Sequence, residues 1–106
     1  MKNPLTILLL SLLFSSSALA ADLRGSFQGL SGATVTVSCG NVTRSAKISS
    51  NGKFRISKLP ANTACQFSVI SGTAASIPIA FNTNKNITQY TGVLRKAGNR
   101  VIVIRK

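Results

Sequence analysis

The stretch that decides the fold is Asn51-Gly52-Lys53-Phe54-Arg55-Ile56-Ser57-Lys58-Leu59-Pro60-Ala61-Asn62. It opens with Asn-Gly, a turn signal, because both residues tolerate positive φ. Apolar and polar side chains then alternate with a period of two, which is typical of a half-buried strand with Phe54 and Ile56 on its inner face. Leu59-Pro60 is expected to end this strand, since proline has no N–H for a ladder. Asn62 can take the left-handed conformation in the next turn.

The same alternation continues on both sides, and residues 21–106 show no 3.6-residue apolar stripe. It predicts short strands at 23–28, 33–39, 42–48, 53–58, 64–70, 76–81, 87–96 and 100–106. Their inward phases carry Leu23, Gly25, Phe27, Val35, Val37, Cys39, Val42, Ala46, Ile48, Phe54, Ile56, Cys65, Phe67, Val69, Ile77, Ile79 and Phe81. About seven short strands with turns every eight to twelve residues indicate an all-β, single-domain β-sandwich. The alternative is a small barrel such as an OB-fold.

Local signals predict how these strands are arranged. The loop 49–52 is expected to join the strands on either side of it into a hairpin. Pro78 marks 76–81 as an edge strand, and Gly92 indicates a bulge or a close backbone approach. Residues 101–104 are apolar on both phases, so we expect that strand to be central or covered on both faces.

The N-terminus predicts export. Lys2 precedes an apolar run at 5–14, and Ala18-Leu19-Ala20 is a small-residue cleavage signal. We therefore interpret residues 1–20 as a signal peptide cut before Ala21, which leaves the β-sandwich domain 21–106 in the periplasm or secreted. The alternative is a short membrane anchor, but the run is half of the roughly 20 residues that a spanning helix needs.

Two cysteines, Cys39 and Cys65, both fall on inward phases of their predicted strands. In a small exported domain this pattern predicts one disulfide, with two buried free thiols as the alternative. Closing a loop of 26 residue steps would stabilise the domain by roughly 3.5 kcal/mol in the chain-entropy model.

Charge is the most unusual feature of the composition. The chain carries a formal charge of +12, and loss of Lys2 with the leader would leave +11. Its one acidic side chain is Asp22. Such a field attracts nucleic acid, lipopolysaccharide or other anionic lipid, acidic polysaccharide, or an acidic protein. The alternative is that the charge serves solubility alone.

Catalytic chemistry has few residues to use. With no histidine and one carboxylate, the chain offers no Ser–His or Cys–His pair and no general acid–base group in its interior. A zinc or calcium site needs more ligands than one aspartate and two bridged cysteines supply. We therefore expect a protein that is not an enzyme and has no cofactor or metal.

The cations form three groups that we predict to bind a polyanion. They are Lys47, Lys53 and Arg55 on the outer face of the 49–52 hairpin with Lys58 at its far end, Arg95, Lys96 and Arg100 beside the last hairpin, and Arg105 and Lys106 in the tail. These side chains point outward with no acid partner nearby. The phenylalanines fall on inward phases, so contacts are expected to phosphates rather than by base stacking. For any one group the alternative is a solvated charged face.

Three segments together carry a resemblance to a known family. Gly32-Ala33-Thr34-Val35-Thr36-Val37, Asn51-Gly52-Lys53-Phe54 and Leu59-Pro60-Ala61-Asn62-Thr63 resemble the carboxypeptidase-regulatory-like domains of the prealbumin-like (transthyretin-like) β-sandwiches. The likeness covers roughly residues 23–70. It departs at Asn62, where the family usually has glycine, and near Ala64, where it often has an aromatic residue. It implies an accessory, stalk or interaction module.

Two functional classes follow from these features. The first is an exported, non-enzymatic binding module for an anionic envelope or extracellular partner, without a small-molecule substrate. The second is a structural or assembly protein that pairs with an envelope protein through a strand edge, at 76–81 or at the C-terminal strand. A secreted inhibitor or host-directed factor is a third reading that the sequence neither supports nor excludes.

Overall fold

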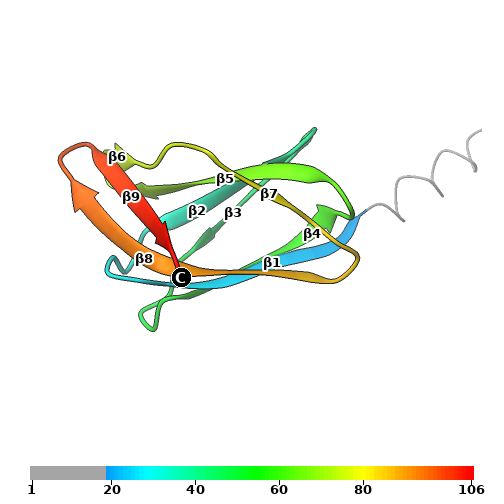
Figure 1. The fold of residues 1–106 in the computed structure, drawn as a ribbon, viewed down its shortest axis with the longest axis horizontal. Coiled ribbons are helices and arrows are strands. Elements are labelled where there is room, and N and C mark those ends of the chain that lie inside the picture. The colour runs from blue at the N-terminus through cyan, green and yellow to red at the C-terminus, as the bar shows by residue number, and fades with distance from the viewer. Residues whose placement is uncertain (1–18) are drawn as a thin grey trace, which may run out of the picture.

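The computed structural model describes residues 19–106 (Figure 1). Every secondary-structure element in that range is a β-strand. They are β1 (Leu19–Gln28), β2 (Thr34–Cys39), β3 (Val42–Lys47), β4 (Lys53–Pro60), β5 (Ala64–Ser71), β6 (Ala74–Ala75), β7 (Ile79–Asn82), β8 (Ile87–Ala97) and β9 (Arg100–Arg105). Within these residues no helix has the length and apolarity needed to cross a membrane.

The predicted leader lies almost entirely outside the described residues. Residues 1–18 are not described, so the structure leaves the signal peptide a prediction. β1 begins at Leu19, which pairs with Pro60. The strand therefore starts two residues ahead of the predicted cleavage point.

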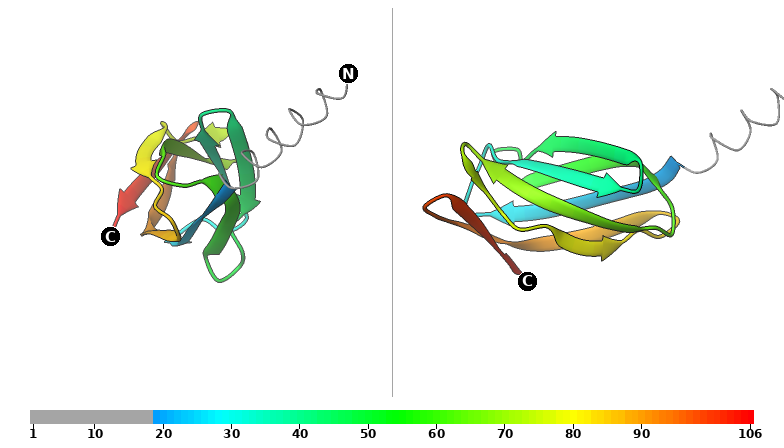
Figure 2. Two further views of the ribbon diagram at one scale, coloured as in Figure 1. Left: turned by 90° about the vertical axis from the view of Figure 1, so that its right-hand side faces the viewer. Right: turned by 90° about the horizontal axis from the view of Figure 1, so that it is seen from above.

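The strands form one hydrogen-bonded path, β3-β2-β5-β6-β9-β8-β1-β4, and β7 adds to β5. Most pairs are antiparallel, but β1 runs parallel to β8. The path curls until its two ends approach each other, and the view along the long axis shows the strands around one centre (Figure 2). The expected all-β class is confirmed. The strands number nine instead of about seven, and the sheet is a nearly closed barrel rather than a clear two-layer sandwich.

Closure of this barrel by backbone pairing is incomplete. One half contains β3-β2-β5-β7 and the other contains β4-β1-β8-β9. Within residues 19–106 the short strand β6 makes the only strand pairing between the halves, through Ala75 and Arg100. Two seams are left without a ladder, one between β3 and β4 and one between β7 and β9.

The core joins the two halves through aromatic rings. Phe27 of β1 stacks on Phe54 of β4 with ring centroids 5.2 Å apart. Phe67 of β5 meets Tyr90 of β8 edge-to-face at 4.9 Å, and Phe27 lies 6.1 Å from Phe67. Aromatic side chains of the barrel centre thus cross from one half to the other.

Most inward phases predicted from the alternation are confirmed. The fully buried side chains include Leu23, Phe27, Val35, Val37, Phe67 and Val69. Because period-two alternation places successive side chains on opposite faces, the burial pattern follows directly from the sequence in β2, β4 and β5.

The predicted disulfide is present between Cys39 and Cys65, with Cα atoms 4.4 Å apart. The register of β2 and β5 ends at Ser38 opposite Gln66, so the cysteines are the next facing pair. The bridge is therefore a cross-strand link inside one half of the barrel, and both cysteines are buried.

The hairpin expected around residues 49–52 is wrong. β3 and β4 are the opposite ends of the path and do not pair, because the loop closes onto β1 instead. The N–H of Phe27 donates to the carbonyl oxygen of Gly52 at 2.8 Å. Gly52 has φ +87°, and a Cβ there would lie 2.6 Å from the Phe27 carbonyl oxygen. Only glycine allows this approach, and it carries the chain from one half of the barrel to the other.

β4 does not end before Pro60, as the Leu59-Pro60 signal predicts, but includes it. Between the pairs Leu23–Ile56 and Ala21–Leu59, two residue steps of β1 face three of β4. Lys58 is the extra residue, with φ +62°. This bulge turns Leu59 inward, where it is fully buried. Pro60 is tolerated because β4 is the end of the path.

Two other strand expectations also need correction. β7 begins only at Ile79, and Ile77 is 68% exposed rather than inward. Ser76 takes the buried place instead, because its Oγ accepts the N–H of Val69 at 2.9 Å. The strand 101–104 lies inside the path between β6 and β8, but it is not covered on both faces, since Ile102 and Ile104 are 42% and 45% exposed. The expected close approach at Gly92 is confirmed, where a Cβ would lie 2.5 Å from the Ile104 carbonyl oxygen.

Removal of the disulfide should lower stability strongly. We expect the Cys39→Ala/Cys65→Ala variant to lose roughly 3.5 kcal/mol of unfolding free energy in urea, because the bridge no longer restricts the unfolded chain. A loss below about 0.5 kcal/mol would show that β2–β5 pairing alone, without the bridge, stabilises this part of the barrel.

Glycine at the bulge should stabilise the fold. Lys58→Gly is expected to raise the unfolding free energy by about 1 kcal/mol, since a left-handed backbone is strained for a residue with a Cβ. Lys58→Ala is the matched control, because it removes the same charge and keeps the Cβ. Equal urea midpoints for the two variants would contradict the strain at this position.

Candidate polyanion-binding surface

The outer face of β4, β1, β8 and β9 carries a row of polar and cationic side chains. Lys53 of β4 pairs with Ser26 of β1, which pairs in turn with Thr91 of β8. The N–H of Lys106 donates to the Thr91 carbonyl oxygen at 2.9 Å. Facing residues on neighbouring strands share one side of a sheet, so Lys53 and Lys106 lie in one row, about 14 Å apart over three strand spacings. We call these four residues the Lys53–Lys106 row.

A groove of about 600 Å³ adjoins this row at the β3–β4 seam. Its polar lining consists of Arg24, Ser26, Lys47, Lys53, Arg55 and Gln89. Lys47 comes from β3 and the other cations from β1 and β4. The groove therefore brings together cations from three strands, two of which are unpaired at this seam.

Asp22 neutralises part of this charge. Its Oδ2 lies 3.2 Å from an Nη2 atom of Arg24 and 3.2 Å from one of Arg55. The expectation that Arg55 has no acid partner is therefore wrong. Four cations and one carboxylate leave the groove region with a charge of +3. Since the sequence has no second acid, Lys47 and Lys53 have no side-chain carboxylate to pair with.

Lys58 lies toward the far end of β4 from the other cations of its predicted group. Five residues separate it from Lys53, which is about 16 Å along a strand. Its carbonyl oxygen accepts the Nε–H of Arg44 at 3.3 Å, near the other end of β4. Arg44 falls on the exposed surface of β3, at an end of the path.

The last hairpin and the tail are divided between the two sides of the sheet. Arg95, Lys96 and Arg100 are exposed beside the turn between β8 and β9. The guanidinium carbon of Arg105 instead lies 4.4 Å from the ring centroid of Tyr90, on the inner side. Of the tail, only Lys106 joins the row on the outer face.

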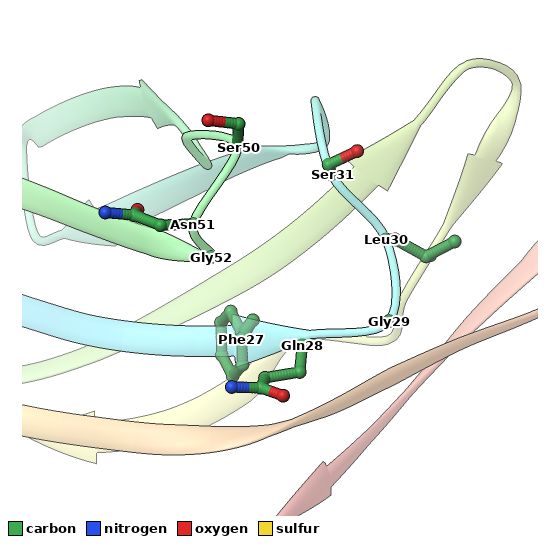
Figure 3. Close-up of a pocket in the computed structure, with 8 residues that line it drawn as sticks. All are labelled: Phe27, Gln28, Gly29, Leu30, Ser31, Ser50, Asn51 and Gly52. Carbon is green, nitrogen blue, oxygen red and sulfur yellow. The ribbon is translucent and has the colours of Figure 1, made fainter.

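A second hollow lies at the end of the barrel where the β1–β2 and β3–β4 loops meet (Figure 3). It measures about 370 Å³ and is lined by residues 27–31 and 50–52. Figure 3 shows Ser31 on one loop and Ser50 and Asn51 on the other. The β3–β4 loop is held by the Ser49 hydroxyl, which donates to the Lys53 carbonyl oxygen at 3.0 Å. Uncharged residues line this hollow, so it offers neither a general base nor attraction for an anion.

The described residues contain no cluster of three or more side chains able to hold a metal ion. All five aromatic residues of 21–106 belong to the core or pack against it: Phe27, Phe54, Phe67, Phe81 and Tyr90. No aromatic platform for base stacking therefore exists on this part of the chain.

The sequence missed the partners that complete this surface. Arg24 is a groove cation that was not assigned to any group, and Gln89 and Thr91 were not identified at all. The outward phase of Arg24, next to Asp22, was a signal that could have found it. No local signal reports that β1 runs parallel to β8, and that pairing places Gln89 beside Arg24.

Comparison with family models, curated proteins and solved structures found no match to this chain. The resemblance of residues 23–70 to carboxypeptidase-regulatory-like domains is thus a prediction from its motifs alone. What the protein binds has to be inferred from its own surface.

Loss of the carboxylate should loosen the groove and strengthen anion binding. In Asp22→Asn, Arg24 and Arg55 lose their shared partner and repel each other, and Arg24 Nε is already buried with no hydrogen-bond partner. We expect the unfolding free energy to fall by about 1 kcal/mol and elution from heparin to need more salt. Asp22→Glu, which keeps the charge, is the control. Unchanged stability and elution in Asp22→Asn would show that the ion pairs contribute nothing.

Proposed function

We propose that this protein is an exported, non-enzymatic binding module for an anionic partner. The partner is a polymer or surface that repeats negative charges, such as lipopolysaccharide, acidic polysaccharide or a nucleic-acid backbone. The observation that carries the proposal is the Lys53–Lys106 row beside the cationic groove. Repeated phosphates or sulfates can contact the row and the groove together and release their counterions.

The burial of the aromatic residues supports a partner recognised by charge. Base stacking needs exposed rings, and the phenylalanines of the described chain and Tyr90 serve the core. Lysine and arginine contacts to phosphates hold a polyanion without reading its sequence. We therefore expect binding that depends on charge density and salt, with little preference for base or sugar sequence.

An oxidising compartment agrees with the disulfide, because such bonds persist mainly outside the cytoplasm. Together with the predicted leader, it favours the periplasm or the extracellular space. A prealbumin-like sandwich stays our proposal for the finer fold. Its support is the motif order and the division of the path into two four-stranded halves.

A salt series tests the proposed binding. We expect the oxidised protein to bind heparin, duplex DNA and lipopolysaccharide with log affinity falling linearly against log salt, by about 0.9 per phosphate contacted on duplex DNA. Lys47→Ala/Lys53→Ala should lower that slope by about 1.8, because it removes two cations of the groove.

The control for this test is Arg44→Ala/Lys58→Gly, which removes the same charge toward the other end of β4 from Lys53, at residues that do not line the groove. Its slope should stay close to that of the unchanged protein. Equal losses in both variants would mean a general effect of net charge. No binding even at low salt would mean that the charge serves solubility alone.

A further inference from the structure

β9 has backbone groups with no strand partner. Its register with β8 is continuous from Arg100 to Arg105, and Lys106 donates to Thr91. Residue pairs along an antiparallel ladder alternate between hydrogen-bonded and non-hydrogen-bonded. Because Lys106 bonds to Thr91, the other even-numbered residues of β9 also bond to β8. The N–H and C=O groups of Val101, Val103 and Arg105 therefore point away from β8. Among residues 19–106 the strand on that side is β6, which bridges to Arg100 and so engages the N–H of Val101, at one end of β9. The groups of Val103 and Arg105 have no strand partner among these residues.

Apolar side chains surround this free edge. A groove of about 240 Å³ lies between β9 and the segment before β7, with Ile77, Ile79, Val101 and Val103 in its walls. Ile77 is 68% exposed, and Ile102 and Ile104 are 42% and 45% exposed. Figure 2 shows β9 leaving the barrel wall toward the C-terminus. The edge thus combines free hydrogen-bonding groups with apolar surface, as edges that accept another strand do.

Charge at both ends of the edge decides which strand fits. Arg100 lies at one end, and Arg105 and Lys106 at the other. A second copy paired antiparallel about Val103 would place Arg100 opposite Lys106 twice, and like charges directly opposite are destabilising. Because the single acid of the chain, Asp22, already pairs with Arg24 and Arg55, no register of two copies offers these cations a carboxylate. A strand with carboxylates at its two ends meets cations in either direction.

We propose that the free edge of β9 binds an extended segment of an acidic partner protein, one that alternates apolar and polar residues between terminal carboxylates. The segment adds a strand at the β7–β9 seam. Its backbone pairs with Val103 and Arg105, and its apolar residues cover the groove wall at Ile77 and Val101. This edge is distinct from the groove at the β3–β4 seam, so either site can be right without the other.

A designed peptide tests the site. The probe is a labelled synthetic peptide that alternates valine and threonine between two terminal aspartates, with a scrambled peptide of the same composition as control. Binding to the full oxidised protein is followed by fluorescence anisotropy at a salt concentration that releases heparin. We expect the alternating peptide to bind and the scrambled one to bind at least about tenfold more weakly, because scrambling destroys the apolar face.

Charge reversal then locates the site. At low salt, where exposed charge contacts are not screened, Arg100→Glu/Lys106→Glu should weaken binding of the aspartate-ended peptide about tenfold and favour a lysine-ended version of it. Lys47→Glu/Lys53→Glu makes the same change in net charge at the other seam and should leave peptide affinity within about twofold. Near-ultraviolet circular dichroism checks that each variant is folded. Equal losses in both variants would overturn the proposal.

Hydrogen exchange supplies a readout that charge alone does not move. On binding, the amides of Val103 and Arg105 should gain protection, while those of Ile102 and Ile104 are already bonded to β8. Peptide binding without this protection would overturn strand addition. No binding at all would also overturn the proposal and would mean that Arg105, Lys106 and Pro78 protect the edge from pairing.

Discussion

The contact of Phe27 with Phe54, Phe67 and Tyr90 is the interaction on which the rest of the structure depends. Within residues 19–106, strand pairing links the two halves of the barrel only through Ala75 and Arg100, so side chains have to hold them together. Aromatic pairs at these separations contribute roughly 0.5–1.5 kcal/mol each beyond their burial. The ring cluster holds the two halves together where backbone ladders do not. The two seams are the places where neighbouring strands close the barrel without pairing.

The two seams have opposite chemistry because different strand phases meet at them. At the β3–β4 seam, the outward phases of β1, β3 and β4 gather cations around Asp22. At the β7–β9 seam, isoleucine and valine side chains line the groove, and the nearby cations of the described chain lie at the two ends of β9. A nearly closed barrel thus presents one surface suited to a charged polymer and one edge suited to an extended peptide. Salt should weaken binding of the polymer far more than binding of the peptide, since screening weakens charge contacts far more than apolar burial.

The single acid also shapes how copies of this protein meet. Any two copies bring together surfaces of the same sign, so exposed strand edges are protected from self-pairing by repulsion. Asp22 already forms ion pairs with Arg24 and Arg55 of the same molecule. The positive surface is therefore directed at partners of another kind, which agrees with both proposals.

How much of the fold and of the candidate site the sequence predicts depends on whether a property is determined by neighbouring residues or by residues far apart in the chain. Strand phase is local, because successive side chains alternate across a strand, so the burial of Val35, Phe54 and Phe67 and the Cys39–Cys65 bridge follow from the sequence, as does the cationic surplus. Which strands become neighbours is not local. It is decided by loops that close over long separations and by the packing of rings from distant strands. Only the folded chain therefore shows that the 49–52 loop crosses to β1, that Arg55 meets Asp22, that Lys53 and Lys106 share a row, and that the apolar strand at 101–104 ends as a free edge.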